Sequence, residues 1–225
     1  MLKGKLCLGY CPQGTGTDYP FNEIFPVSRN LQTGFEGVDA VVLWGGEDIH
    51  PSYYNEEPHP LNQARNNLVP SRRDVFEWKV MLHCYTEGIP IIGVCRGAQF
   101  LCAFAGGSLV QHVNNHTNGN HLVTTSHGEI LPVTSCHHQM MYPYDVEHEL
   151  LAWSKEKRST FYEGPKQAPI ASMDTRPEPE VVYFPKVRGL AIQGHPEWAQ
   201  PNSRFVSYVN ELVKTRLLNQ AVVAA

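Results

Sequence analysis

Apolar residues mark three strand candidates in the first half of the chain, at residues 5–10, 38–44 and 90–94, and the last two are apolar runs. The run VDAVVLW at 38–44 is almost entirely apolar and ends in two glycines. Strands that are buried on both faces of a parallel sheet have this continuous pattern, whereas half-buried strands alternate apolar with polar residues. The three runs therefore predict buried, parallel strands.

Helical spacing separates these runs. The strongest helix signal covers residues 71–87, where Ser71 is the predicted N-cap, Asp74 completes a capping-box arrangement and Gly88 ends the helix. Residues 21–32 and 97–105 are also predicted to be helical. A chain that alternates strands with helices forms right-handed crossovers around a parallel sheet.

The second half of the chain has a different pattern, with short apolar stretches separated by turns. It predicts strands at residues 108–113, 122–125, 129–133, 169–173, 181–184 and 190–193. Their close spacing indicates an antiparallel or mixed extension. Residues 202–218 predict an amphipathic terminal helix, capped by Asn202 or Ser203. The predicted fold class is α/β, a three-layer sandwich with a mostly parallel central sheet and a small antiparallel extension.

Composition and charge narrow the classes of protein that fit this pattern. The 225 residues are 42% hydrophobic and 18% charged, which predicts one globular domain over residues 1–225. The net charge is −4 and basic residues form no extended patch, so we expect no nucleic-acid partner. A small acidic substrate is compatible with this charge.

The N-terminal stretch and the cysteines indicate the cellular compartment in which we expect the protein. Glycine and proline interrupt residues 1–14, so we expect no signal peptide there, and no apolar run has the length of a membrane span. The six cysteines form no C-x-x-C pair in this strand-helix chain. We therefore expect reduced cysteines in a cytoplasmic protein.

One cysteine lies between two glycines where the third predicted strand turns into a helix. The sequence Gly93-Val94-Cys95-Arg96-Gly97 has the form of a nucleophile elbow. A cysteine at a helix N-terminus is favoured as the reactive thiolate, because unpaired N–H groups point toward it. Cysteine is also among the residues most often buried as inert packing. This segment alone leaves both interpretations open.

A candidate base lies beyond the last predicted strand. His195 and Glu197 are two residues apart, so in extended backbone their side chains share a face. The carboxylate can then orient one imidazole nitrogen while the other faces a thiol, as nucleophilic catalysis requires. Because parallel strands end at a common edge, His195 can meet Cys95 there. The alternative is a surface histidine beside a solvated carboxylate.

Taken together, these segments resemble the class I glutamine amidotransferase family of the triad type. GVCRGAQ at 93–99 and GHPE at 194–197 carry the resemblance. WGGEDIHP at 44–51, RDVFE at 73–77 and VTSCHHQ at 133–139 are similar to its γ-glutamyl hydrolase branch, which includes γ-glutamyl-γ-aminobutyrate hydrolase and is peptidase C26-like. The resemblance implies a flavodoxin-like fold of the class I glutamine amidotransferase type.

The resemblance also implies a Cys-His-Glu triad. Cys95 would attack the γ-amide carbonyl of a glutamine-like substrate and form a γ-glutamyl thioester. His195, oriented by Glu197, would transfer protons to the leaving amine and from the hydrolytic water. The backbone N–H groups of Gly46 and Arg96 would form the oxyanion hole.

Further positions follow from the same resemblance. The implied substrate-binding residues are Gln99, Ser135 and His137. The charged residues at 73, 74 and 77 form either a network under the elbow or an ordinary helical charge pattern. Trp44 departs from the branch, which has proline there, so the oxyanion loop is expected to differ in detail.

The second half is rich in histidine, at 112, 116, 121, 127, 137 and 138. Histidine clusters can bind metals, but these spacings fit no zinc template and the family chemistry requires no metal. We therefore expect no metal and no cofactor, with some of these histidines lining the acceptor side of the pocket.

The resemblance favours a cysteine-dependent amidohydrolase that cleaves glutamine, a γ-glutamyl amine or a γ-glutamyl peptide. The alternative is a glutaminase subunit that delivers ammonia to a separate synthetase partner. An inactive binding module and an elbow-cysteine protease or chaperone are the remaining interpretations. The predicted partner is a small γ-glutamyl substrate. We expect no association with a membrane, and the formation of a homo-oligomer stays open. The leaving amine depends on loops at 47–70 and 113–127, and loops carry specificity.

Overall fold

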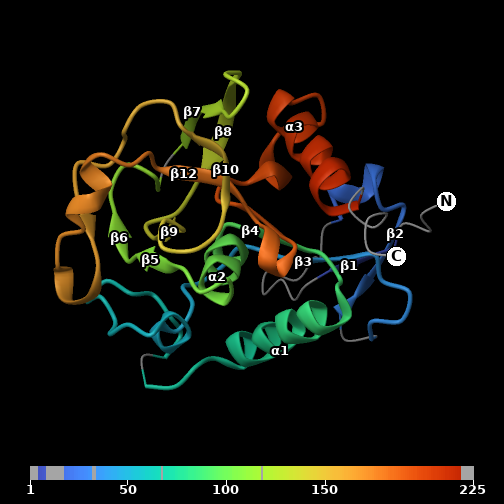
Figure 1. Ribbon diagram of the computed structural model, residues 1–225, viewed down its shortest axis with the longest axis horizontal. Coiled ribbons are helices and arrows are strands. Elements are labelled where there is room, and N and C mark those ends of the chain that lie inside the picture. The colour runs from blue at the N-terminus through green and yellow to red at the C-terminus, as the bar shows by residue number, and fades with distance from the viewer. Residues whose placement is uncertain (1–4, 9–17, 32–33, 67, 118, 219–225) are drawn as a thin grey trace.

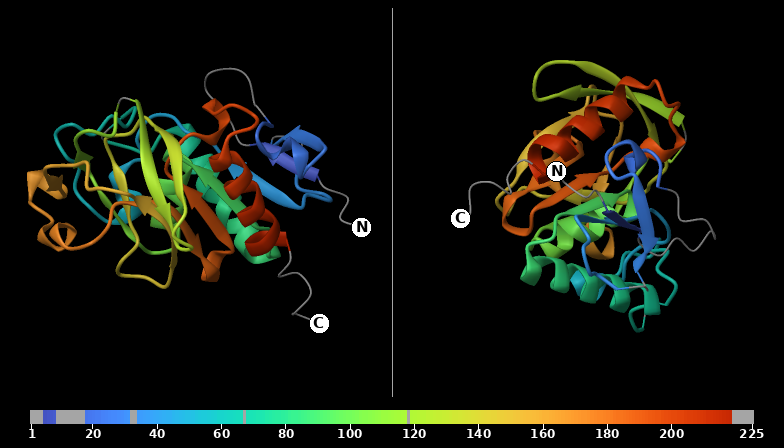
Figure 2. Two further views of the ribbon diagram at one scale, coloured as in Figure 1. Left: turned by 90° about the horizontal axis from the view of Figure 1, so that it is seen from above. Right: turned by 90° about the vertical axis from the view of Figure 1, so that its right-hand side faces the viewer.

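The computed structural model describes residues 5–8, 18–31, 34–66, 68–117 and 119–218. Within them, nine strands form one sheet in the order β2-β1-β3-β4-β13-β12-β10-β7-β8. Helices cover both faces of this sheet (Figures 1 and 2). Two further pairs, β11-β6 and β5-β9, form separate two-stranded sheets.

The first five strands in this order are parallel, and all of them except the edge strand β2 are mainly apolar. They are β2 (Val27–Asn30), β1 (Lys5–Leu8), β3 (Ala40–Leu43), β4 (Ile91–Val94) and β13 (Gly189–Ile192). Their carboxyl ends share one edge of the sheet. Because β4 and β13 are adjacent, the residues that follow each of them emerge side by side at that edge.

Helices α1 (Arg72–Glu87) and α2 (Arg96–Phe104) lie on one face, and α3 (Arg204–Leu212) lies on the other (Figure 1). A π-helical turn, Val213–Leu218, continues α3. On β3, Ala40 and Val42 pack in the core under α3, whereas Val41 and Leu43 pack in the core under α1 and α2. Alternate side chains of β3 therefore pack into two separate hydrophobic cores, as expected for a strand covered on both faces.

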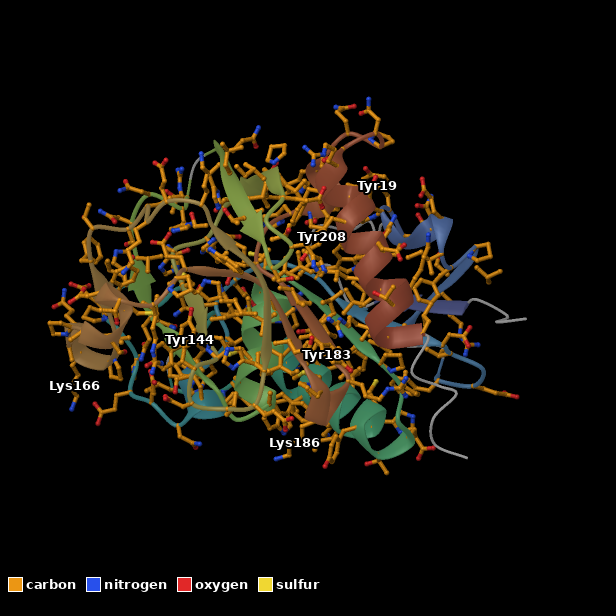
Figure 3. All side chains as sticks on the ribbon, turned by 45° about the horizontal axis from the view of Figure 1, so that its top comes forward. Tyr19, Tyr144, Lys166, Tyr183, Lys186 and Tyr208 are labelled. Carbon is orange, nitrogen blue, oxygen red and sulfur yellow. The ribbon has the colours of Figure 1, made fainter. Side chains whose placement is uncertain are left out.

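The antiparallel part is larger than the sequence pattern predicted. It adds β12 (Pro179–Phe184), β10 (Glu149–Ser154), β7 (Gly119–Thr125) and β8 (Ile130–Ser135) to the main sheet. The small pairs are β5 (Ser108–Val110) with β9 (Met140–Tyr142), and β6 (His112–Val113) with β11 (Tyr162–Glu163). The Tyr208 hydroxyl on α3 (Figure 3) donates to the carbonyl of Leu151 on β10 at 2.7 Å, so α3 also fastens this part of the sheet.

Two predicted elements are wrong. Residues 21–31 form a short 3-10 helix, Phe21–Glu23, and then β2, because Pro26 cannot continue a helix and Val27–Asn30 pairs with β1. Residues 169–173 make one bridge, between Pro169 and Glu163, and then enter a 3-10 helix, Ala171–Asp174. Predicted positions 9, 10 and 32 lie outside the described residues.

The remaining short elements are 3-10 helices: Pro51–Tyr54, Pro165–Gln167, Pro185–Val187 and Pro196–Trp198. Each begins with proline, whose fixed φ suits a first helical position. None of the described helices combines the length and apolar character that a membrane span requires.

Candidate active site

Cys95 occupies the turn between β4 and α2, in a conformation that L residues seldom adopt. Its φ is 52° and its ψ is −108°. The two flanking glycines make the turn possible: a Cβ on Gly93 would lie 2.4 Å from the carbonyl oxygen of Gly97, and one on Gly97 would lie 2.1 Å from that of Leu43. The thiol residue is 5% exposed. The elbow predicted from the sequence is therefore present, with the backbone strain that such elbows store.

His195 and Glu197 meet this elbow from the end of β13. Nδ1 of His195 lies 2.7 Å from Oε1 of Glu197, and the backbone N–H of His195 donates to the carbonyl of Thr134 at 2.9 Å. A Cβ on Gly45 would lie 3.1 Å from Cε1 of His195 and 3.4 Å from Cβ of Cys95. The structure thus brings imidazole, thiol and the Gly45 backbone into one small space.

The electrostatics of His195 follow from this crowding. Burial lowers its pKa, but the Cys95 thiol and the Glu197 carboxylate more than offset burial and raise the pKa to about 10. Nε2 is buried and makes no hydrogen bond to any described residue. The thiol is close enough to shift the pKa without meeting hydrogen-bond geometry, so Nε2 is left available on the side of the elbow.

Sequence reasoning missed Trp198, which stacks on the His195 ring with centroids 3.7 Å apart and planes at 4°. Trp198 is 53% exposed, so it lies at the solvent side of the imidazole. An aromatic face favours a cation over it, which adds to the preference for protonated His195. The only sequence signal was a tryptophan directly after GHPE.

A buried charge network lies behind the elbow, built from Arg73, Asp74 and Glu77 on α1 and Arg96 on α2. Arg73 Nε donates to Glu77 Oε1 at 2.8 Å, and Arg96 donates to both Glu77 and Asp74. All four side chains are at most 6% exposed. Asp74 also completes the predicted capping box with Ser71. These contacts agree with the network interpretation and not with an exposed charge pattern.

The same network reaches the predicted oxyanion loop. Arg73 donates to the carbonyls of Trp44 at 2.8 Å and Gly45 at 3.1 Å. Gly46 has φ 149°, and a Cβ there would lie 2.3 Å from Nη1 of Arg73. Arg96 is the first residue of α2, where backbone N–H groups have no acceptor within the helix. Gly46 and Arg96 therefore lie on segments that the network joins.

The predicted substrate-binding residues are buried and already hydrogen-bonded. Gln99 Nε2 donates to the carbonyl of Gln139 at 2.9 Å, and Nδ1 of His137 lies 2.8 Å from the same oxygen. The Ser135 hydroxyl donates to the carbonyl of His116 at 2.8 Å. The side chains of Ser135 and His137 thus hold a segment in place, and substrate contact by them stays a prediction.

That segment forms one wall beside the cysteine, because the carbonyl oxygen of Cys136 lies 3.9 Å from Sγ of Cys95. The loop at 47–70 is tied to the neighbouring strands and turns. Its Asp48 lies 2.9 Å from His138, and Glu57 pairs at 2.9 Å with Lys166, which is labelled at the edge of the molecule in Figure 3. The other predicted loop, 113–127, contains β7.

Comparison with known proteins gives a consistent result. A family model described as Peptidase C26 matches residues 24–168, a range that includes Cys95 and ends before His195. Gamma-glutamyl-CDP-amidate hydrolase of Campylobacter jejuni is 34% identical over 82 residues, 35% of this chain and 35% of that protein. Protein NtpR of Enterococcus hirae is 35% identical over 95 residues, 41% of this chain and 38% of that protein.

These matches cover only part of each protein: the chain spans between 30% and 47% of the length of the curated relatives. A solved structure of a glutamine amidotransferase from Thermotoga maritima is similar over 98% of this chain and over 90% of its own chain. Its TM-score is 0.55 and its identity is 16%, so the likeness is one of fold.

Proposed function

The chain belongs to the peptidase C26 family, and we propose that it is a cysteine-dependent amidohydrolase acting on the γ-amide bond of glutamine or of a γ-glutamyl amine or peptide. The family and the relatives indicate an enzyme of the amidohydrolase or amidotransferase class. The elbow at Cys95 and the His195–Glu197 pair support the narrower assignment.

In the proposed reaction, the Cys95 thiolate attacks the γ-carbonyl carbon and forms a tetrahedral intermediate. Nε2 of the protonated His195 gives its proton to the departing amine, the C–N bond breaks and a γ-glutamyl thioester remains. His195 then removes a proton from water, the resulting hydroxide attacks the thioester, and glutamate and the thiolate are released. Glu197 holds the imidazole by Nδ1 throughout, at 2.7 Å in the resting structure.

The oxyanion of each intermediate would be bound by the backbone N–H groups of Gly46 and Arg96. Such donors need no reorganisation as charge develops, which makes them effective. The N-terminus of α2 adds a favourable dipole at the same place. We also assign Gln99, Ser135 and His137 to the substrate-binding wall, either directly or by holding its backbone.

The observation that carries this proposal is the meeting of the elbow residue Cys95 with His195, whose Nδ1 lies 2.7 Å from Glu197. The raised pKa of His195, caused by the adjacent thiol and carboxylate, agrees with it. A buried cysteine beside a histidine that a carboxylate orients is the arrangement of a cysteine-histidine nucleophile. A structural histidine at the end of a strand has no need of this pairing.

The test is a hydrolysis assay of the full chain with glutamine, γ-glutamyl-putrescine, γ-glutamyl-γ-aminobutyrate and polyglutamates. Wild type should release glutamate from at least one of them, and rapid acid quench should trap a γ-glutamyl adduct on Cys95. Cys95→Ala should lose both signals. The matched control is Cys102→Ala, since Cys102 is a fully buried thiol in α2 whose pKa burial raises to about 12. Equal activity of wild type and Cys95→Ala would disprove the assignment.

The same assay separates the alternative role as a glutaminase subunit with a separate synthetase. A free-standing hydrolase turns over without additions. A subunit hydrolyses glutamine slowly by itself and accelerates when a partner binds, and its ammonia then appears in the partner's product. Silence on every γ-glutamyl amine together with partner-activated glutamine hydrolysis would favour that role.

A further inference from the structure

A buried cluster of histidine and glutamate lies beyond the Ser135–Gln139 wall. His116 precedes β7, His137 follows β8 and Glu180 belongs to β12, so three separate segments contribute. The three residues are 1%, 5% and 1% exposed. Each offers one ligand atom, and these atoms all lie within 4.8 Å of one another.

Hydrogen bonding fixes which nitrogen of His137 carries a proton. Its Nδ1 lies 2.8 Å from the carbonyl oxygen of Gln139, which can only accept, so the proton resides on Nδ1. Nε2 is then a lone pair, and it is buried without a hydrogen-bond partner among the described residues.

His116 has the opposite arrangement. Its Nε2 lies 3.2 Å from Oε2 of Glu178. The same carboxyl group accepts from the backbone N–H groups of Arg158 at 3.0 Å and Ser159 at 2.8 Å and from the Tyr162 hydroxyl at 2.9 Å, so it acts as an acceptor. The proton of neutral His116 is therefore favoured on Nε2. Nδ1 is then left as a lone pair, and neither ring nitrogen, both of them buried, meets hydrogen-bond geometry with a described residue.

Glu180 completes the set. Its Oε1 lies 2.8 Å from Nε2 of His121 and 3.9 Å from Nδ1 of His116. Its Oε2 is buried, and no described residue donates to it. Lone pairs of His116, His137 and Glu180 thus lie within one small buried space. Buried acceptors without donors are costly and rare in folded proteins, so each calls for a ligand.

We propose that this cluster binds a divalent transition-metal ion, Zn²⁺ in the first instance, through Nδ1 of His116, Nε2 of His137 and the carboxylate of Glu180. Two imidazole nitrogens with one carboxylate oxygen are a recurrent zinc ligand set. Tetrahedral ligands of zinc are about 3.3 Å apart, so each atom must move inward by less than about 1 Å.

The surroundings of the cluster fit a metal ion better than an accidental gathering of polar groups. Both ligand imidazoles have their second nitrogen turned to an oxygen acceptor, Gln139 O and Glu178 Oε2, which is the outer arrangement that metal-bound histidines show. The carboxylates of Glu178 and Glu180 carry a formal charge of −2, which a divalent cation balances. Sequence spacing gave no zinc template because the ligands come from three segments.

A bound ion would brace the candidate active site without entering its chemistry. His137 directly follows Cys136, whose carbonyl oxygen faces the Cys95 thiol at 3.9 Å. Glu180 lies on β12, and its own backbone carbonyl accepts from the N–H of Gln193, two residues before His195. The ion would therefore link the Ser135–Gln139 wall to β12 and, through β12, to the segment that carries His195. This inference does not depend on the proposed reaction.

The test measures metal directly. The full chain, purified without an affinity histidine tag, is stripped with a chelator and dialysed against Zn²⁺, and bound metal is counted by mass spectrometry. We expect one Zn²⁺ per chain and a thermal midpoint that rises with free Zn²⁺. His116→Gln and Glu180→Gln should each weaken binding on the order of 10- to 100-fold or more, since loss of even an outer partner has that effect.

Controls keep the outcome interpretable. His127→Gln removes an exposed histidine of the same region and should bind Zn²⁺ as wild type does. Glu180→Gln keeps the shape, and its amide can donate to a lone pair, so it should fold and lose the Zn²⁺ dependence of its midpoint. The proposal would be overturned if wild type held no Zn²⁺, or if Glu180→Gln bound Zn²⁺ as tightly as wild type does. Doubly protonated His116 by NMR in zinc-saturated wild type would overturn it as well.

Discussion

Glu77 offers a sharp test of the buried charge network. The residue is fully buried, and its two carboxylate oxygens each accept from a different guanidinium, Arg73 at 2.8 Å and Arg96. With Asp74, the network contains two cations and two anions, so its formal charge is zero. Glu77→Gln keeps the volume, removes one negative charge and turns an amide NH₂ toward a guanidinium. It leaves one positive charge unbalanced in the interior.

Removing one partner of a buried ion pair costs about 3–5 kcal/mol, because the other partner stays desolvated. For a chain of this size, each kcal/mol shifts the thermal midpoint by about 2–4 °C, so we expect a fall of roughly 6–20 °C. Urea unfolding followed by circular dichroism gives the free energy directly. The second readout is kcat, since Arg73 holds the carbonyls of the predicted oxyanion loop.

The matched control is Glu87→Gln, at the exposed last residue of the same helix. There the change removes a negative charge near the negative end of the helix dipole, so stability should stay within about 0.5 kcal/mol of wild type or rise slightly. If Glu77→Gln also lies within about 1 kcal/mol of wild type, the network does not depend on charge balance, and the reasoning fails.

Three further predictions concern the elbow and its histidine. Cys95→Ala should move the NMR titration of His195 from near pH 10 to a clearly lower pH, because the thiol raises this pKa. Protonation of His195 stabilises the fold fully below its ordinary pKa of 6.5, and this stabilisation is lost as pH rises through 10. The stability advantage of wild type over Cys95→Ala should therefore shrink between these two pH values, and a constant difference would contradict this. Trp198→Ala should lower the His195 pKa by roughly 0.5 unit through loss of the stacked face, with Trp198→Phe nearly neutral; equal pKa values in all three proteins would speak against the cation–π effect. Gly93→Ala places a methyl group 2.4 Å from a backbone carbonyl and should cost more than about 2 kcal/mol in urea unfolding, whereas Gly164→Ala, with contacts of 3.4 Å or more, should be nearly silent.

The parallel half of the fold was predictable because its signals are local. Residues 38–44 and 90–94 are apolar on both faces, and Ser71, Asp74 and Gly88 delimit α1 as capping chemistry requires. The fold class and the resemblance to glutamine amidotransferases are confirmed by the family match and by solved structures. The antiparallel half was harder, because β10 pairs with β12 and β7 across long sequence separations and its segment ELLAWS has no simple alternation.

The candidate site divides in the same way. Cys95, His195 and Glu197 could be found because each follows a predictable strand within a few residues. Stacking of Trp198 on His195 depends on the turn at Pro196–Trp198, which no period in the sequence reveals. The His116 cluster depends on the pairing of β12 and β7 with their neighbours, so residue spacing alone carried no sign of it.

Arg73 has a consequence for the orientation of one peptide plane. A trans peptide unit is rigid, so its C=O and N–H point in opposite directions. Arg73 holds the carbonyl of Gly45 at 3.1 Å, and the N–H of Gly46 in the same unit must therefore point away from Arg73. If this unit rotated by half a turn, the predicted oxyanion donor would be replaced by a carbonyl that repels negative charge. Arg73 thus fixes the polarity of the loop. Its loss would let the loop exchange an attractive face for a repulsive one while every side chain of the predicted triad stayed in place.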